Sequence, residues 1–399
     1  MLKPHLKKPV EIVMMPDHSP TVHWLGTGLS STPGLQKLAQ QERPLRVWNR
    51  TLQKAQKALS GVVRADVSAH VFNLPDLEDR LQSGDIVVSM LPASMHPEIA
   101  TLCLKRHAHL VTASYLSPEM QAFNARAKEL DLCFVNEIGL DPGLDHLMAF
   151  EAVSALKQSP HWHDPQARVT FKSLCGGLSE IPNDFRYRFS WSPIGVLRAL
   201  KNQAVFIENQ KPKTTQRAWT AVETIRIGSE LFEAYPNRNS LPFVSEYGLD
   251  QGSFKIETFV RGTLRHHGWK EAWDPIFQQI ENTTEAELTS LSESLWKQHA
   301  LPDTENDRVV LLVSLESHSR KHGHWAYSGL IDLIGGPAGS AMAQLVSLPI
   351  ASLTQQILKG EVPSGVTTAP KDKAFRDRLF NELGKDGIKL SRRISWENV

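Results

Sequence analysis

The chain has 399 residues, which is too long for one hydrophobic core and indicates two or three domains. Hydrophobic residues make up 41% of it and charged residues 22%, as in an ordinary globular protein and unlike a disordered chain. The formal net charge is only +1, so the composition gives no sign of a basic surface for nucleic acid or for a membrane. We therefore expect neither partner.

Three cysteines, Cys103, Cys133 and Cys175, are widely spaced and form no Cys-x-x-Cys pair. This spacing argues against a disulfide framework and against a zinc site, and it favours a reducing, cytoplasmic setting. Prolines interrupt the apolar residues of the first twenty positions, so we expect no secretory signal there, and no apolar run is long enough to span a bilayer.

Three histidine pairs are candidate metal ligands by sequence, but each lies in a polar segment without a neighbouring cysteine or a helical histidine spacing. The pairs are His161 with His163, His266 with His267, and His322 with His324. We expect these to be surface histidines, and the sequence predicts no metal.

In chain order, the first predicted strand covers residues 22–25 and runs into Gly26-Thr27-Gly28, after which a helix is predicted from about residue 33. Gly26 permits a tight turn, and Gly28 lets the backbone approach a pyrophosphate held at the helix N-terminus. Ser31 stands where a third small residue normally packs the helix against the strand. This strand, glycine turn and helix predict a dinucleotide site.

The second predicted strand, residues 45–48, ends in Asn49-Arg50-Thr51. An NAD-specific site would carry an acidic residue there for the ribose 2′-hydroxyl, and none is present. Because an arginine and a threonine suit a 2′-phosphate, the segment favours NADP. The alternative is that Arg50 is a solvated surface charge.

Further strands are predicted over residues 62–66, 85–91, 107–112 and 132–135, with a helix near residues 74–81. Six short strands that alternate with helices predict an α/β fold, a doubly wound parallel Rossmann sheet. The apolar run 85–91 suits a strand buried on both faces.

The stretch from Asn136 to His146 follows the last of these strands and combines glycine, proline and carboxylates. We predict Asp141 as the N-cap of a helix, Pro142 as its first residue, and a helical end near Lys157. A loop between the carboxyl end of a strand and a helix N-terminus is also where α/β proteins bind ligands. The stretch is therefore either a well-capped helix or part of a binding site.

After residue 157 the pattern changes to β-rich segments, predicted over residues 167–173, 187–192, 224–227 and 257–265. Residues 273–301 have helical periodicity, 309–316 and 324–334 predict an antiparallel pair, and 340–358 predict an apolar helix that packs back on the first domain. We expect a Rossmann domain over 20–140, completed by 335–399. A mixed α+β domain is expected over 141–334, with a small helical insertion at about 267–305.

The motifs occur together in one known family. The chain resembles the saccharopine reductases, the NADP-dependent, L-glutamate-forming saccharopine dehydrogenases of lysine metabolism. The motifs that carry this resemblance are 26–28, 49–51, 114–115, 136–143, 175–178, 189–192, 235–238 and 261–265, in the order of the family.

The glycine turn and the resemblance together imply cofactor contacts along the first domain. These residues are Gly26, Gly28, Leu29, Ser30, Ser31, Thr32, Asn49, Arg50, Thr51, Asp66, Val67, Met90, Thr112, Ala113, Gly139, Leu140 and Asp141. The resemblance further implies substrate contacts, which are Ser114, Tyr115, Asp141, Phe189, Ser190, Arg238 and Thr263. It also implies NADP as cofactor, small-molecule substrates and a homodimer, with the second domain making the substrate and dimer contacts.

The implied reaction joins glutamate and 2-aminoadipate 6-semialdehyde in an imine, and hydride transfer from NADPH then gives saccharopine. Asp141 is the candidate to interact with the developing secondary ammonium, since a nearby carboxylate favours the charged amine. Water can transfer the protons, so no side chain is assigned as the formal acid or base. Two alternatives remain, a carboxyspermidine-type imine reductase and a non-catalytic NADP-binding regulator.

Overall fold

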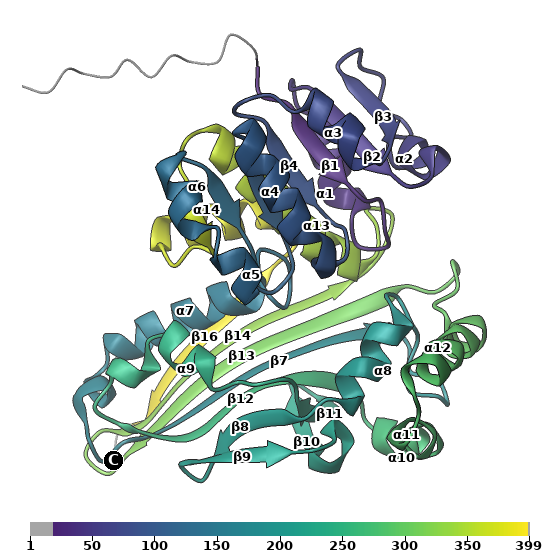
Figure 1. Ribbon diagram of the computed structural model, residues 1–399. Helices are drawn as coiled ribbons and strands as arrows, with labels where there is room; N and C mark the ends of the chain where they lie inside the picture. Colours follow the sequence, from purple (N-terminus) through teal and green to yellow (C-terminus); the bar gives the residue numbers. More distant parts are fainter. Residues whose placement is uncertain (1–18, 398–399) are drawn as a thin grey trace, which may run out of the picture.

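The structure, a computed structural model, describes residues 19–397. Figure 1 shows two parts, a small sheet wrapped by helices above a larger sheet of long strands, with helix α7 (Leu144–Lys157) between them. The expectation about a signal in the first twenty residues lies almost wholly outside the described residues. No described helix is long and apolar enough to cross a membrane.

The upper sheet has seven strands in the order β15-β6-β5-β4-β1-β2-β3, and every neighbouring pair is parallel. Its strands are β1 (Val22–Leu25), β2 (Leu45–Asn49), β3 (Val67–Val71), β4 (Ile86–Ser89), β5 (His109–Thr112), β6 (Cys133–Val135) and β15 (Gly365–Thr367). In β4, Ile86 and Val88 belong to one hydrophobic core and Val87 to another, because successive side chains point to opposite faces. Helices therefore cover both faces, and the predicted doubly wound fold is confirmed.

The helices of this part divide between the two cores. Helices α1, α2 and α13 contribute to one core and α3, α4 and α6 to the other. The helical bounds are α1 (Thr32–Ala39), α2 (Leu52–Ala58), α3 (Leu74–Arg80), α4 (His96–Arg106), α5 (Pro118–Gln121), α6 (Asn124–Glu129), α13 (Ala341–Leu358) and α14 (Lys373–Lys385).

The third strand was predicted wrongly at residues 62–66, which form a loop in which Val63 is 96% exposed. The strand is β3, where Val67 pairs with Leu45. As the last strand of the sheet, β3 is only half-buried along most of its length, so it lacks the apolar run that marks central strands. The sequence pattern favoured residues 62–66 because the adjacent Val62 and Val63 are more apolar than the residues of β3.

The lower sheet has nine strands, with the main order β10-β11-β12-β7-β13-β14-β16 and with β8 and β9 joined through β12. The pair β12 and β7 is parallel and the other pairs are antiparallel, so the sheet is mixed, as predicted. The strands are β7 (Arg168–Ser179), β8 (Ala204–Glu208), β9 (Lys211–Thr215), β10 (Glu223–Ile227), β11 (Glu230–Pro236), β12 (Lys255–His266), β13 (Asp307–Ser319), β14 (Gly323–Ile334) and β16 (Leu390–Glu397).

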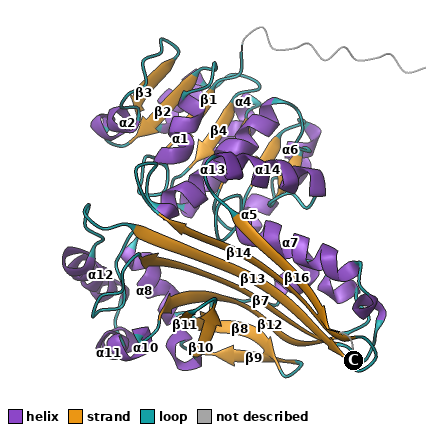
Figure 2. Ribbon diagram, turned by 180° about the vertical axis from the view of Figure 1, so that it is seen from behind, coloured by secondary structure: helices purple, strands orange, loops and turns teal. Residues whose placement is uncertain are grey.

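Short helices gather at one end of this sheet (Figure 2). They are α8 (Pro193–Lys201), α10 (Trp269–Ala272), α11 (Asp274–Glu281) and α12 (Glu285–His299), while α9 (Pro242–Glu246) lies beside α7. The helical periodicity predicted for 273–301 is confirmed. Residues 19–397 also contain four single turns of 3₁₀ helix, which are Ala93–Met95, Pro160–His163, Ala218–Ala221 and Leu249–Gln251.

The strand predicted over 187–192 is absent, since that segment forms irregular backbone between β7 and α8. Its aromatic residues alternate because Tyr187 and Phe189 pack edge to face and join Trp273 of the helical end in one core. An aromatic cluster, and not a sheet face, explains the alternation.

The C-terminal segment returns to both parts of the molecule. Helix α13 packs against α1, where the Gly34 backbone N–H donates to Ser347 Oγ at 2.8 Å. A Cβ on Gly34 would lie 2.1 Å from the Ser347 carbonyl oxygen, so only glycine permits this approach. Strand β15 extends the parallel sheet beside β6, whereas β16 pairs with β14 of the lower sheet. The domain boundaries expected from the sequence stay predictions.

Candidate functional site

The glycine turn after β1 opens the candidate site. Gly26 has φ +93° and its backbone N–H donates to the Trp48 carbonyl at 2.8 Å, which brings the turn against β2. A Cβ placed on Gly28 would meet nothing within 4 Å, so the space above the turn is open. Ser31 is buried and donates to the Gly28 carbonyl at 3.0 Å, which shapes the entry into α1 at Thr32. Backbone N–H groups at such a helix N-terminus can face an anion.

Arg50 lies directly after β2, at the same edge of the sheet. It is exposed, and no ion pair or side-chain hydrogen bond joins it to the rest of residues 19–397. The Asn49 side chain contacts Thr27 of the glycine turn and accepts a hydrogen bond from the Thr51 backbone at 3.4 Å. An arginine without a protein partner beside the glycine turn suits a phosphate.

The other predicted cofactor residues fall into two groups. Met90, Thr112 and Ala113 end β4 and β5, and Gly139 and Leu140 follow β6, so all lie near the carboxyl edge of the parallel sheet. Asp66 and Val67 do not join them. They lie at the opposite end of β3, where Val67 is level with Leu45. Residues 71–73 occupy the carboxyl end of β3 instead, because the strand starts later than the sequence suggested.

A cavity of about 330 Å³ lies between this edge and the lower sheet. Ser30, Ala113 and Leu140 line it from the parallel sheet, Thr263 from β12, and helices α8 and α13 close it. Four of the predicted substrate residues also line it, namely Tyr115, Asp141, Arg238 and Thr263. The structure thus brings the cofactor edge and most of the substrate residues to one cavity.

Three predicted substrate residues are placed differently. Phe189 is fully buried in the aromatic core. Ser114 Oγ lies 2.9 Å from His96 Nε2, beneath the end of β5. Ser190 is near the cavity wall, since its Oγ lies 4.0 Å from the position of a Cβ on the lining residue Gly177. That hydroxyl is buried and has no hydrogen-bond partner in the part of the chain that the structure describes.

The loop at 139–143 corrects the predicted helix start. Helix α7 begins at Leu144 with Gly143 in the N-cap position, so Asp141 is not the N-cap and Pro142 is not the first helical residue. The loop folds back on itself, because the Gly139 N–H donates to the Pro142 carbonyl at 2.9 Å. Asp145 Oδ1 accepts the Gly143 N–H at 2.7 Å and takes over the capping role. The Asp141 side chain is left to face the cavity.

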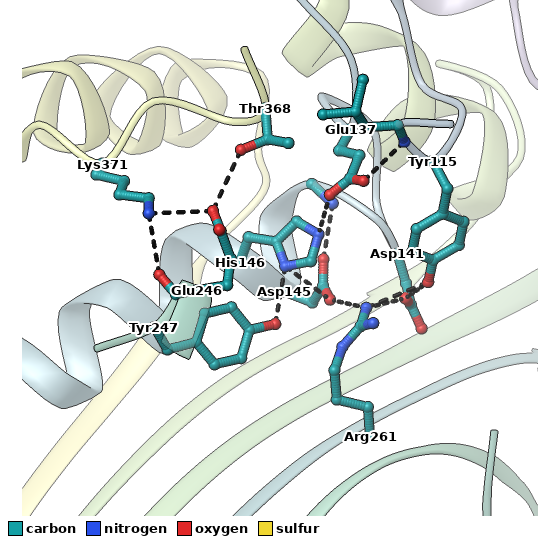
Figure 3. Close-up of polar contacts among 12 residues, drawn as sticks. Tyr115, Glu137, Asp141, Asp145, His146, Glu246, Tyr247, Arg261, Thr368 and Lys371 are labelled. Carbon is teal, nitrogen blue, oxygen red and sulfur yellow. Dashed lines mark hydrogen bonds and ion pairs between the residues drawn. The ribbon is translucent and has the colours of Figure 1, made fainter. Parts of the chain in front are cut away.

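Arg261 of β12 links the loop to the lower sheet (Figure 3). Its Nη2 lies 2.9 Å from Asp141 Oδ1 and 2.6 Å from Asp145 Oδ2. Tyr115 joins them, since its hydroxyl donates to Asp141 Oδ1 at 3.0 Å. The guanidinium also lies over the Phe243 ring at 3.9 Å. Three elements that are far apart in sequence are held together by this one cation.

A second set of polar groups extends the network away from the cavity (Figure 3). His146 Nε2 lies 2.9 Å from Glu137 Oε2, and its Nδ1 lies 2.8 Å from the Tyr247 hydroxyl. Glu137 also accepts the Leu116 backbone N–H at 2.8 Å. These groups are buried, so they fix the orientation of Asp145 through the adjacent His146.

The two aspartates differ in their electrostatics. Burial, followed by the neighbouring charge of Asp145, raises the pKa of Asp141 above its usual range. Burial also opposes the ionised form of Asp145, but His146 and Arg261 outweigh it and lower the pKa of Asp145. Burial and the Asp141 charge raise the pKa of Tyr115 well above its usual value, so its hydroxyl stays protonated and donates. Asp145 is therefore the permanent counter-ion of Arg261, and Asp141 is the carboxylate that gains or loses a proton more easily.

Arg261 was not predicted as a site residue, although the sequence holds a usable signal. In a strand, alternate residues share a face, so Arg261, Thr263 and Arg265 of β12 lie on one side. Thr263 was placed at the site by resemblance, and the alternation would have added both arginines. Cys175, the β7 neighbour of Thr263, also lines the cavity, and burial raises its pKa well above the usual value.

One group of side chains has ligand atoms close enough together to hold a metal ion. Glu316, His318 and His324, at one end of the β13–β14 hairpin, have ligand atoms within 4.8 Å of one another. The imidazoles of His318 and His324 stack at 4.2 Å between centroids. The expectation of surface histidines is wrong for His161 and His266, which are buried. The absence of a metal stays a prediction from the sequence.

Comparison with known families gives two matches along the chain. The model of the saccharopine dehydrogenase NADP binding domain matches residues 22–135. The model of the saccharopine dehydrogenase C-terminal domain matches residues 139–388. The two matches meet at the loop that carries Asp141, so each contributes to the same cavity.

Individual relatives agree with these matches. A saccharopine dehydrogenase [NADP(+), L-glutamate-forming] from Pyricularia oryzae is 27% identical over 94% of this chain and 99% of its own length. The apo saccharopine dehydrogenase (L-Glu forming) of Saccharomyces cerevisiae has a similar fold, with a TM-score of 0.79, 24% identity and coverage of 94% of this chain and 100% of that chain. A homospermidine synthase of Legionella pneumophila, solved with NAD, shares the fold at a TM-score of 0.60 and 12% identity, over 94% of this chain and 91% of that one.

Proposed function

Because the chain belongs to the saccharopine dehydrogenase family, we propose that it is an NADP-dependent oxidoreductase that interconverts saccharopine with L-glutamate and 2-aminoadipate 6-semialdehyde. The observation that carries the proposal is the cavity between the two sheets. It joins the glycine-turn edge to a carboxylate, Asp141, and to an unpaired arginine, Arg238. A hydride acceptor and a carboxylate-rich amine can meet there.

The residues at the edge of the parallel sheet fit NADP. Gly28 leaves open space for the pyrophosphate, and the N-terminus of α1 offers backbone donors. Arg50 is free to pair with the 2′-phosphate, and no acid follows β2 to repel it. When bound, the nicotinamide ring supplies or accepts the hydride.

Asp141 is placed to interact with the reacting nitrogen. Tyr115 and Arg261 both contact its Oδ1, which fixes the carboxylate plane, while Oδ2 accepts no hydrogen bond from any side chain or backbone group within residues 19–397. The side chain is 24% exposed, toward the cavity that it lines. A carboxyl group with a raised pKa can give its proton to the imine nitrogen, and addition of a hydride to the carbon of that iminium gives a neutral secondary amine. The carboxylate left on Asp141 then stabilises the ammonium that forms when the amine takes up a proton from water.

Arg238 is proposed to hold a substrate carboxylate at the mouth of the cavity. Its guanidinium lies over the Tyr115 ring at 4.7 Å and is exposed, and no acidic group pairs with it in the described part of the chain. Stacking on one face leaves the planar edge free for two parallel hydrogen bonds to a carboxylate. Substrate and cofactor would then be oriented by opposite walls.

One experiment separates the proposal from its rivals. Purified enzyme is mixed with NADPH, 2-aminoadipate 6-semialdehyde and glutamate, and the loss of NADPH absorbance is followed. A parallel reaction contains aspartate semialdehyde and a diamine, the substrates of a carboxyspermidine-type reductase. We expect turnover in the first reaction only, because a cationic diamine would be repelled by Arg238. Turnover only with the diamine would refute the proposal, and no turnover in either would favour a regulator.

We also infer a homodimer and a cytoplasmic location. The three cysteines are free, which suits a reducing compartment. Strand β16 ends the lower sheet, and its Ile394 and Trp396 are 59% and 50% exposed. An unpaired edge with apolar side chains can bind the same edge of a second copy. Sedimentation should give a dimer for the wild type and a monomer for Ile394→Asp, and a monomeric wild type would contradict this.

A further inference from the structure

Two histidines and a glutamate at the hairpin end of β13 and β14 lie outside the cavity and have no part in the function proposed above. They are Glu316 and His318 on β13 and His324 on β14, at the end of the lower sheet away from helices α8 and α12 (Figure 2). We propose that these three side chains bind a divalent transition-metal ion such as Zn²⁺, which fastens the two strands to each other. This inference does not depend on the proposed function.

The backbone places the three side chains on one face of the sheet. Glu316 and His318 are alternate residues of β13, so they point to the same side. His324 is directly opposite His318 in the antiparallel register, and the side chains of such a pair share a face. Ser317 points to the other face, where its Oγ lies 2.9 Å from His161 Nδ1. The histidine pairs that led to no predicted metal are neighbours along the chain, whereas His318 and His324 meet across two strands.

The distances within the group are short enough for one ion. The ligand atoms of Glu316, His318 and His324 all lie within 4.8 Å of one another. The two imidazole rings have centroids 4.2 Å apart and planes inclined by 12°. A tetrahedral zinc ion with bonds of about 2.0–2.1 Å needs ligand atoms about 3.3 Å apart, so a shift of about 1–2 Å brings them into place. Such a shift is possible because none of the three side chains is fully buried.

His324 gives an independent indication of a ligand. Its Nε2 is buried and has no hydrogen-bond partner within residues 19–397. Glu316 Oε2 lies 3.8 Å from this nitrogen, which is too long for a hydrogen bond. A buried polar atom without a partner costs free energy, and coordination of a metal ion by the imidazole nitrogen satisfies it.

The charges around the group favour a cation. Glu397 of β16 is level with His324, so a second carboxylate belongs to the same neighbourhood. Arg168 of β7 is level with His318, but its Nη1 pairs with Glu257 Oε2 at 3.3 Å. Two further cations beside His318 are exposed, so water and salt screen their charges; they are Lys255 and Arg320.

The ligand types select the class of metal. Two imidazoles and one carboxylate suit Zn²⁺, Ni²⁺ or Cu²⁺, whereas Mg²⁺ and Ca²⁺ prefer oxygen ligands alone. The group is level with Arg168 of β7, and Gly177 of the cavity wall is nine positions further along that strand, a distance of about 30 Å. The ion would therefore stabilise the lower sheet without touching the reacting groups.

Zinc binding is measured by calorimetry on protein that a chelator has first freed of metal. The wild type and the variants His318→Gln, His324→Gln and Glu316→Gln are compared with the control His163→Gln, which changes an exposed histidine outside the group. We expect one zinc ion per chain, a Kd raised at least about tenfold in each of the three variants and unchanged in the control, and no heat from Mg²⁺. A wild type that binds no zinc, or a Kd that is the same in all variants, overturns the proposal.

Two further readouts distinguish this site from zinc bound elsewhere on the surface. Cu²⁺ bound to the wild type should give an electron paramagnetic resonance signal split by two imidazole nitrogens, and His324→Gln should reduce the splitting to that of one. Zinc at a hundredfold excess over its Kd should raise the Tm of the wild type by about 5–10 °C and that of His324→Gln much less. A copper signal without nitrogen splitting, or an equal rise in Tm in the variant, overturns the proposal. No readout uses turnover, so a failure of the proposed function leaves the test unaffected.

Discussion

Replacing Arg261 by methionine should destabilise the protein through the two aspartates that it leaves behind. The Arg261 side chain is 6% exposed and that of Asp145 is 1% exposed, so the pair is buried. Methionine can cover the Phe243 ring as the arginine does, but it carries no charge. The variant then holds the Asp145 carboxylate next to Asp141 without the cation that both contact.

Removing one partner of a buried ion pair typically costs about 3–5 kcal/mol. For a domain of this size, each kcal/mol shifts Tm by roughly 2–4 °C, so we expect Tm to fall by about 6–20 °C at pH 7. The matched control is Arg168→Met on β7, whose ion pair with Glu257 is 3.3 Å long with a 60% exposed arginine side chain. An exposed pair contributes about 0–1 kcal/mol, so this control should change Tm little.

The pH dependence has a definite sign. The pKa of Asp145 is lowered in the folded protein, against its burial, by His146 and Arg261. Asp145 therefore contributes stability that is present above the ordinary carboxyl pKa, about 4, and that is lost as pH falls through the lowered value. Arg261→Met removes part of this contribution, so the difference from the wild type should be large at pH 7 and shrink only below about pH 4, as the pH approaches the lowered pKa of Asp145.

The assay is thermal unfolding followed by circular dichroism between about pH 2 and pH 8, a range that includes the pH at which the Asp145 contribution is lost. Adding Asp145→Asn to the methionine variant should recover more than half of the lost Tm, because asparagine can still accept the Gly143 N–H without a charge. A loss below about 1 kcal/mol, or no recovery in the double variant, would refute the view that charge burial dominates at this site.

Three substitutions test the remaining roles. Asp141→Asn should lower kcat about a hundredfold with the KM for NADPH unchanged, and an unchanged kcat would remove Asp141 from the chemistry. The same variant should be more stable than the wild type at pH 7 by about 1 kcal/mol, because burial and Asp145 raise the pKa of Asp141 and its ionised form is unfavourable; the gain should vanish in acid, and lower stability at pH 7 would contradict the sign. Arg50→Ala should raise the KM for NADPH about tenfold to hundredfold and leave that for NADH nearly unchanged, whereas equal losses would indicate a role in folding. Arg238→Lys should raise the KM for saccharopine while NADPH binding by fluorescence titration stays intact, and kinetics like those of the wild type would place Arg238 outside the site.

Several features followed from the sequence because their physical cause is local. The parallel sheet was predicted from short apolar runs such as the one that forms Ile86–Ser89. A strand needs apolar side chains on both faces only when helices cover both faces of its sheet. The turn at Gly26 and the arginine after β2 are each defined by a few consecutive residues. They could therefore be predicted as parts of a dinucleotide site without knowledge of the rest of the chain. The hairpin of β13 and β14 was predicted for the same reason, since its strands are joined by a short turn.

Features that depend on a neighbour far along the chain were decided by the tertiary structure. Strand β3 is half-exposed, so its position became visible only through its pairing with β2. The sequence predicted Asp141 as the helix N-cap, whereas Gly143 holds that position and Asp145 accepts its N–H. The choice depends on the way the loop from Gly139 folds back, which frees Asp141 for the cavity.

The charged residues of the site show most clearly which features the sequence determines and which the tertiary structure decides. Arg261 is 120 positions from Asp141. The strand alternation places Arg261 on the same face as Thr263, but it does not indicate that Arg261 meets Asp141. Arg265 of β12 is a stronger case, because its lack of a counter-ion within residues 19–397 follows from the contacts that its cross-strand neighbour Glu233 makes. A cross-strand acid would ordinarily neutralise it, and only the position of α10, which takes both oxygens of Glu233, leaves the arginine unpaired. Composition supplies the charges, whereas the packing of distant elements decides which of them remain free to bind a ligand.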